Sequence, residues 1–169
     1  MSKIGLFYGS DTGNTERIAE LIAEKIGNDK IELVDLNRAE PDAMENYEKL
    51  IFGAPTWYDG ELQSDWDSYF DNLDSIDFSN KTVAIFGLGD QYGYPDYFLD
   101  AMGIIYDKLI EKGAKVVGAW DCSDYDFTSS KAERDGKFVG LGIDEDNEDD
   151  KTEDRINEWI KIIEPDICT

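Results

Sequence analysis

Short apolar runs and amphipathic segments alternate along the chain. Runs in which nearly every residue is apolar are typical of strands buried on both faces, whereas apolar residues recurring every three or four positions are typical of helices with one buried face. The strand-like runs are 3–8, 31–36, 49–54, 82–87 and 115–120, and the helix-like segments are 14–26, 64–73, 94–112 (with the longest helix) and 152–163. The alternation predicts an α/β fold with a mostly parallel sheet between two layers of helices.

Residues 121–150 interrupt this alternation. We interpret them as an insertion that splits the fifth strand, which resumes near Phe138 in a short apolar piece. The acid-rich residues 144–154 are typical of a solvated loop that favours the N-terminus of the following helix, with Asp150 as the expected cap. The sequence shows no internal repeat and no linker, so we expect one domain over residues 1–169.

The first strand leads into a loop of small polar residues at the start of the first helix. Ser10, Thr12 and Thr15 supply hydroxyl groups, and a helix N-terminus supplies unpaired N–H groups and a positive dipole end. The loop lacks the Gly-Lys-Ser/Thr of nucleotide-hydrolysing proteins, and the spacing from Gly9 to Gly13 differs from the dinucleotide-binding pattern. The loop therefore predicts a phosphate site of neutral donors or, alternatively, a plain turn in which these residues act as caps.

Two further loops combine aromatic residues with glycine. One follows the third strand and contains Trp57 and Gly60; the other follows the fourth strand and contains Gly89 and Tyr94. Parallel strands end at the same edge of a sheet, so we expect both loops to meet the hydroxyl loop. Aromatic side chains can stack on a flat ring, and glycine allows close approach of the backbone. The three loops together predict a site for a mononucleotide with a large planar ring.

The formal net charge of −23, from 39 acidic and 16 basic residues, changes which partners are plausible. Proteins that bind nucleic acid or anionic membranes are basic at the contact surface, so the charge argues against both. It favours either solubility alone or attraction to a basic protein partner.

The sequence contains no histidine, which excludes His-based catalytic triads and most zinc and haem sites. Cys122 and Cys168 fit no metal or redox spacing. We expect both to be reduced thiols in a cytoplasmic protein, because the N-terminus does not resemble a signal peptide. Redox chemistry would have to come from a cofactor.

At these loops the chain closely resembles flavodoxins of the long-chain group. The resemblance is carried by Ser10-x-Thr12-Gly13-x-Thr15, Pro55-Thr56-Trp57 and Gly87-x-Gly89-Asp90-Gln91-x-Gly93-Tyr94. Residues 136–141 are similar to the long-chain insertion, and residues 144–147 to its cyanobacterial and algal members. The resemblance implies a three-layer, flavodoxin-like doubly wound sandwich. Its sheet would have five parallel strands in the order 2-1-3-4-5, with the insertion in the fifth strand.

The resemblance also implies a noncovalently bound FMN and a low-potential one-electron carrier, a ferredoxin substitute rather than an enzyme. Trp57 would flank the isoalloxazine on the protein side and Tyr94 on the solvent side, with the phosphate on residues 10–15. The implied cofactor-binding residues are Ser10, Asp11, Thr12, Gly13, Asn14, Thr15, Thr56, Trp57, Tyr58, Asp59, Gly60, Gly89, Asp90, Tyr94 and Tyr97. It implies no catalytic residue and no metal ligand.

The implied partners are basic docking surfaces of redox proteins, such as ferredoxin-NADP reductase-like flavoenzymes and photosystem I. We expect a monomer that neither binds nucleic acid nor inserts into a membrane. The alternative is an FMN-dependent NAD(P)H:quinone reductase of the same fold, but the sequence offers no basic clamp for the NADPH phosphate. A signalling receiver domain would need acidic residues after the first strand and an Asp after the third, where this chain has Ser10-Asp11-Thr12 and Pro55-Thr56-Trp57.

Overall fold

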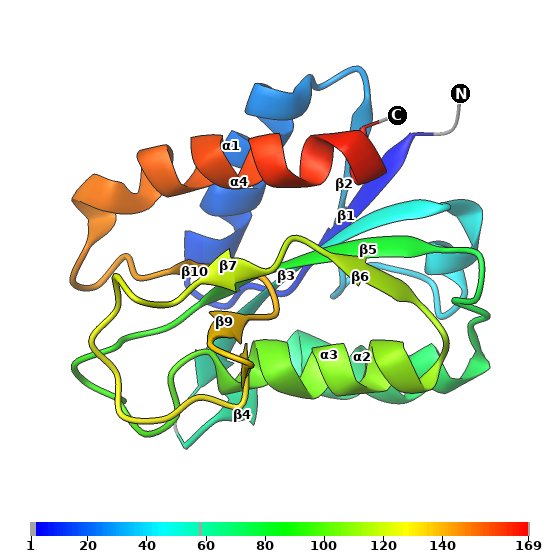
Figure 1. The fold of residues 1–169 in the computed structure, drawn as a ribbon. Helices are drawn as coiled ribbons and strands as arrows, with labels where there is room; N and C mark the ends of the chain where they lie inside the picture. The colour runs from blue at the N-terminus through cyan, green and yellow to red at the C-terminus, as the bar shows by residue number, and fades with distance from the viewer. Residues whose placement is uncertain (1–2, 58, 169) are drawn as a thin grey trace.

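The computed structural model describes residues 3–57 and 59–168, and its centre is a parallel sheet (Figure 1). Four strands lie in the order β2, β1, β3, β5, and two short strands, β6 and β10, both pair with the outer side of β5. This arrangement confirms the predicted strand order. The strands are β1 (Ile4–Tyr8), β2 (Ile31–Asp35), β3 (Lys49–Trp57), β5 (Thr82–Leu88), β6 (Lys115–Val117) and β10 (Leu141–Ile143).

Strands β6 and β10 are the two halves of the split fifth strand. Val117 lies opposite Ala84, and Leu141 lies opposite Phe86. Between them, the insertion forms a small antiparallel sheet from β7 (Trp120–Asp121), β8 (Glu133–Arg134) and β9 (Lys137–Phe138). The split is confirmed, but the expected restart near Phe138 is wrong. Phe138 pairs with Trp120 inside the insertion and is fully buried, where it joins the same core cluster as Phe52 and Phe98.

Helices cover both faces of the sheet (Figure 1). Consecutive strand residues point to opposite faces, so Phe52 joins the core on one side and Ile51 the core on the other. The helices α1 (Asn14–Ile26) and α4 (Thr152–Ile167) pack on the Ile51 side, and α2 (Ser64–Tyr69) and α3 (Asp100–Glu111) on the Phe52 side. A two-residue strand, β4 (Glu61–Leu62), pairs antiparallel with the end of β3.

Several element boundaries differ from the predictions. Strand β3 continues through Pro55 to Trp57, because β4 supplies it with a new partner there. Helix α3 begins at Asp100 and is shorter than α4. Asp150 does not cap α4; it lies in a 3₁₀ turn, Asp149–Lys151, that leads into the helix. Two further 3₁₀ turns, Ala43–Asn46 and Phe70–Ser75, complete the connections.

Gly53 in β3 is packed so closely against the neighbouring strand that a side chain has no room there. A Cβ atom there would lie 2.3 Å from the Phe86 ring on the neighbouring strand, whereas at Gly87 in β5 the nearest atom would be 3.3 Å away. We predict that Gly53→Ala lowers the free energy of unfolding by about 1–3 kcal/mol, the usual cost of overpacking. Gly87→Ala, the matched control, should cost less. Urea denaturation measures both, and equal losses would contradict this account of the packing.

Candidate functional site

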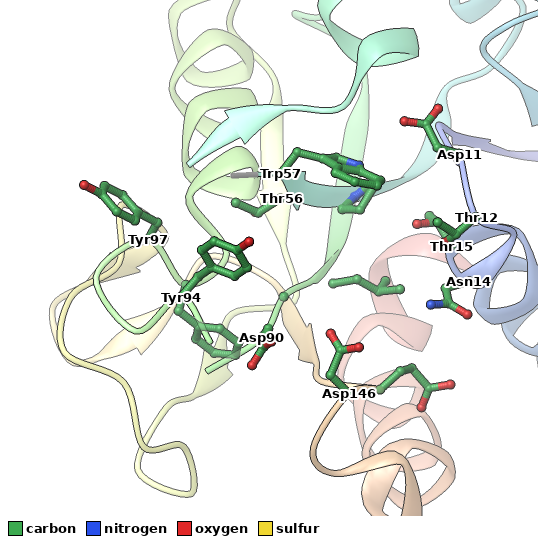
Figure 2. Close-up of a pocket in the computed structure, with 15 residues that line it drawn as sticks. Asp11, Thr12, Asn14, Thr15, Thr56, Trp57, Asp90, Tyr94, Tyr97 and Asp146 are labelled. Carbon is green, nitrogen blue, oxygen red and sulfur yellow. The ribbon is translucent and has the colours of Figure 1, made fainter. Parts of the chain in front are cut away.

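A cavity of about 250 Å³ opens where β1, β3, β5 and β10 end (Figure 2). Each strand passes into a loop that contributes part of its wall, so the parallel sheet brings segments far apart in sequence to one place. The loop after β1 lies opposite Tyr94 and Tyr97 in Figure 2. The lining residues are Asp11, Thr12, Asn14, Thr15, Pro55, Thr56, Trp57, Leu88, Gly89, Asp90, Tyr94, Tyr97, Phe98, Glu145 and Asp146.

The loop after β1 directs the N-terminus of α1 into the cavity. Gly13 precedes the helix with φ +90°, a left-handed conformation that glycine adopts without strain. The Gly13 N–H donates to Ser10 Oγ at 3.0 Å, which closes the turn. Thr12 and Thr15 then lie at the cavity, with Thr15 only 1% exposed. Hydroxyl groups and a helix N-terminus together make a site for an anion.

Asp11 is held beside this anion site by a buried amide. Gln63 is 1% exposed and its Nε2 donates to Asp11 Oδ1 at 2.8 Å and to Asp65 Oδ2 at 2.9 Å. Its Oε1 accepts the Trp66 N–H at 3.4 Å, so the same side chain caps α2. A neutral donor therefore satisfies two carboxylates, one in the loop after β1 and one in the first turn of α2, without placing a cation beside them.

The loop after β3 is packed against the start of α3. Thr56 Oγ1 accepts the Ala101 N–H at 3.1 Å. Gly60 has φ +85°, and a Cβ on it would lie 2.5 Å from Asp100 Oδ2. Burial raises the pKa of the Asp100 carboxyl, although its Oδ1 accepts the Lys131 N–H at 2.7 Å. Only glycine fits position 60 without strain, because both the backbone conformation and Asp100 exclude a side chain.

The loop after β5 is organised by Asp90. Its Oδ1 accepts the backbone N–H of Tyr92 at 3.1 Å and of Gly93 at 2.7 Å, and the Asn147 Nδ2 at 2.7 Å. Tyr94 follows, lines the cavity and is 45% exposed. The turn thus presents an aromatic ring at the mouth of the cavity.

The turn after β10 also lines the cavity, a role that we did not predict. Glu145 and Asp146 lie in the acid-rich segment that we expected to be a solvated loop. Glu145 is ion-paired with Arg17 and accepts from the Thr152 hydroxyl. Burial, Asp90 and Asp144 raise the pKa of Asp146. Among the described residues that line the cavity, all the charged ones are acids, so the site disfavours added negative charge near them.

The structure brings most of the predicted residues together. Ten of the implied residues line the cavity: Asp11, Thr12, Asn14, Thr15, Thr56, Trp57, Gly89, Asp90, Tyr94 and Tyr97. Ser10, Gly13, Asp59 and Gly60 are not among the lining residues and shape the neighbouring turns, whereas Tyr58 lies outside the described residues. Prediction from the sequence missed Leu88, Phe98, Glu145 and Asp146, and named Pro55 only as part of a motif.

Comparison with known proteins identifies the family. Residues 6–159 match the family model for flavodoxin. The chain is 52% identical over 166 residues to a flavodoxin of Picosynechococcus sp., covering 98% of both chains. This chain belongs to the flavodoxin family. It is also 48% identical over 169 residues to a flavodoxin of Haemophilus influenzae, covering 99% of this chain and 97% of the relative.

Solved flavodoxins share the whole architecture. The Fusobacterium nucleatum flavodoxin bound to flavin mononucleotide superposes with a TM-score of 0.94 at 32% identity, covering 99% of each chain. Oxidised flavodoxin 1 of Bacillus cereus gives a TM-score of 0.72 at 31% identity, covering 96% of this chain and 97% of the other. In open α/β sheets ligands bind at the carboxyl ends of strands near a reversal of strand order, and flavodoxins are among the standard examples of that rule.

The contacts of Asp90 lead to a prediction about the loop after β5, residues 89–99, which we call the third loop. Burial raises the pKa of its carboxyl, but the bonds from Gly93, Asn147 and Tyr92 outweigh burial and hold it below the ordinary value. A carboxyl with a lowered pKa stabilises the folded protein at neutral pH and ceases to do so as pH falls through that pKa. We predict that Asp90→Ala reduces the hydrogen-exchange protection of the Tyr92 and Gly93 amides about tenfold, as removal of a charged acceptor implies.

Nuclear magnetic resonance at neutral pH measures this exchange. In the unmodified protein, protection of the two amides should decline only at acid pH, when Asp90 takes up a proton. The exposed Asp96, in the same loop, provides the control variant Asp96→Ala. Unchanged protection in Asp90→Ala would contradict the role assigned to this carboxylate.

Proposed function

We propose that this protein binds FMN noncovalently in the cavity and carries single electrons between redox proteins at low potential, as a carrier rather than an enzyme. The main support is the cavity itself, which joins an anion site at a helix N-terminus to an aromatic surface in a chain of the flavodoxin family. Bound FMN would supply the redox chemistry, because its ring accepts and releases electrons one at a time.

The loop after β1 would hold the FMN phosphate. Thr12 and Thr15 would donate their hydroxyls, and the first N–H groups of α1 would add the positive end of the helix dipole. Ser10 and Gly13 would keep the turn in shape through their hydrogen bond. Asp11 and Asn14 would border the same end of the cavity.

The other two loops would hold the ring. Trp57 and Tyr94 would lie against its two faces, and Thr56 and Tyr97 beside them. The backbone near Gly60, Gly89 and Asp90 would contact its polar edge. The carboxylates of Asp90 and Asp146 would make added negative charge on the ring unfavourable, which would keep the potential low.

Stepwise anaerobic reduction of the FMN-loaded protein tests this function. We predict two resolved one-electron steps in the visible spectra, at more widely separated potentials than free FMN in the same buffer. The acidic surroundings should make the second step the harder one. A single two-electron step would favour the alternative, an FMN-dependent NAD(P)H:quinone reductase.

We also propose a setting for this carrier. It would act as a cytoplasmic, single-domain monomer in place of ferredoxin, with ferredoxin-NADP reductase-like flavoenzymes or photosystem I as partners. The net charge of −23 supports basic docking surfaces on them. In residues 3–57 and 59–168, no helix is both long and apolar enough to cross a membrane.

Charge attraction to a basic partner predicts a strong effect of salt. Electrostatic screening shortens from about 30 Å at 0.01 M to about 8 Å at 0.15 M ionic strength. The second-order rate of electron transfer to a basic flavoenzyme should therefore fall several-fold over that range, as stopped-flow absorbance would measure. Reduction of a small uncharged quinone serves as the control. A rate to the flavoenzyme that is as insensitive to salt as the control would contradict guidance by charge.

A further inference from the structure

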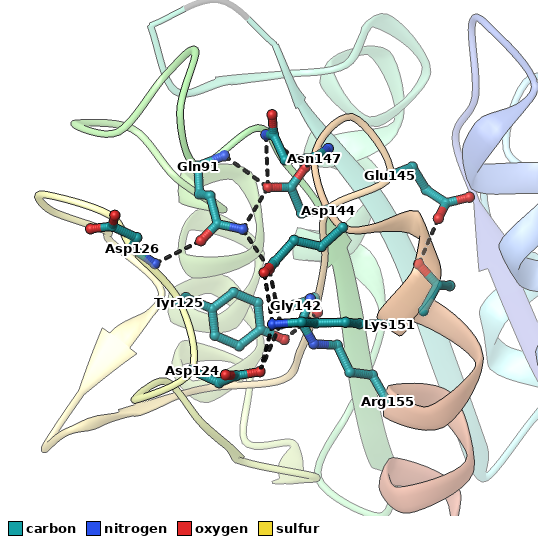
Figure 3. A network of polar contacts seen from close by, with 12 residues as sticks. Gln91, Asp124, Tyr125, Asp126, Gly142, Asp144, Glu145, Asn147, Lys151 and Arg155 are labelled. Atoms are coloured by element: carbon teal, nitrogen blue, oxygen red, sulfur yellow. Dashed lines mark hydrogen bonds and ion pairs between the residues drawn. The ribbon is translucent and has the colours of Figure 1, made fainter.

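Gln91 is a buried amide on the loop after β5 that points toward Asp126 and Asp144 (Figure 3), and it is not among the described residues that line the cavity. Its side chain is 1% exposed. Burying a primary amide is unfavourable unless its donors and acceptor are satisfied. The three partners of this amide come from two segments that are distant from it in sequence.

One partner is the insertion. The Asp126 N–H donates to Gln91 Oε1 at 2.6 Å, so the backbone of the insertion is tied to the third loop at this point. The same loop is held nearby by the Pro95 carbonyl, which accepts the N–H of Thr128 at 2.8 Å and of Ser129 at 3.0 Å. The insertion and the loop after β5 are therefore joined by hydrogen bonds at two places, Gln91 and Pro95.

The other partners are acids of the turn after β10. Gln91 Nε2 donates to Asp144 Oδ2 and to Glu148 Oε1, both at 2.7 Å. Asp144 is fully buried and also accepts the Gln91 N–H at 3.2 Å and the Asn147 N–H at 3.1 Å. Asn147 in turn reaches Asp90 of the third loop. Both elements that Gln91 joins, the third loop and the acidic turn, carry residues that line the cavity.

The charges around Gln91 explain why an amide is required. Asp144 and Glu148 face it directly, and Arg155 and Lys151 lie beyond Glu148, both paired with Asp124 as well. Burial alone would raise the pKa of Glu148, but the bonds from Lys151, Gln91 and Arg155 bring it to about 2. Asp90 and the exposed Asp126 complete the charged surroundings. A glutamate at position 91 would place a third carboxylate beside the buried Asp144 and the partly buried Glu148.

We propose that Gln91 is a positioning residue for the FMN site: its amide fixes the third loop to the insertion and to the acidic turn, and so sets the shape of the cavity. Gln91 is not itself one of the described residues that line the cavity. This proposal rests on the proposed binding of FMN. It also gives the insertion a role within the chain, as a support for the loop that carries Tyr94.

The experiment compares apoprotein variants by their affinity for FMN, measured by quenching of FMN fluorescence. Gln91→Glu keeps the shape and removes the donor, so FMN should bind about tenfold more weakly at about pH 7. Asn80→Asp, at an exposed turn, adds the same charge elsewhere and should bind like the unmodified protein. If the Gln91→Glu variant bound FMN as tightly as the Asn80→Asp variant, the proposal would be overturned.

Measuring FMN affinity at lower pH distinguishes a positioning role of Gln91 from general damage to the fold by the substitution. As pH falls below neutral, the glutamate of Gln91→Glu should take up a proton, because the carboxylates of Asp144 and Glu148 beside it disfavour its charged form. A protonated carboxyl donates a hydrogen bond again, so the affinity ratio to the unmodified protein should recover. Gln91→Met, which cannot titrate, should show no recovery. Equal pH profiles for the two variants would contradict the mechanism.

Hydrogen exchange in the FMN-free protein provides a measurement that does not depend on the cofactor. The Asp126 amide donates to Gln91, so Gln91→Met should reduce its protection while amides of the central strand β5 keep theirs. If the unmodified protein failed to bind FMN, the proposed function would fail, and this measurement would still test the role of Gln91. Unchanged protection of Asp126 would overturn that role.

Discussion

Parallel pairing of the central strands is the constraint on which the rest of this molecule depends. Tyr8 lies opposite Gly53, Gly53 opposite Phe86, and Ile143 opposite Leu88. This register makes neighbouring strands end close together at one edge of the sheet. Both faces of the sheet are covered by helices, so the polar loops can gather only at the ends of the strands. The cavity, the helix N-terminus and the aromatic side chains meet there because of the register.

Gathering these loops creates an electrostatic problem, because each brings carboxylates. Asp11, Asp90, Glu145 and Asp146 all border the cavity, and bringing like charges together opposes closure of the site. In the described part of the chain, these carboxylates are hydrogen-bonded mainly by neutral donors. Gln63 donates to Asp11, and Asn147 and backbone N–H groups donate to Asp90. Arg17 at Glu145 is the exception. Neutral donors stabilise the carboxylates without cancelling their negative charge. The negative electrostatic potential at the cavity, which a low-potential carrier needs, is therefore preserved.

The sequence predicts the sheet well because its strands are buried on both faces and leave unbroken apolar runs. The phosphate loop and the loops around Trp57 and Tyr94 are also predictable, since glycine, hydroxyl and aromatic residues follow strand ends in a distinctive order. Phe138 was misassigned because an apolar residue that packs on the core from the insertion gives the same local signal as one in the central sheet. Glu145 and Asp146 were missed because an acidic run resembles a solvated loop wherever it folds. The role of Gln91 depends on three partners from distant segments, which no local pattern reveals.

The split fifth strand has a consequence for protein engineering and for divergence within the fold. Val117 and Leu141 pair with residues of β5 on either side of Ile85, so the sheet edge is nearly continuous across the junction. Residues 118–140 therefore leave the sheet and rejoin it at almost the same point. A short linker could join Val117 directly to Leu141. The insertion can therefore change its exposed loops without altering the register of the sheet, although its residues Tyr125, Ala132 and Phe138 pack in the same core cluster as Phe52 and Met102. Selection on it would act mainly through its contacts with the loop it supports.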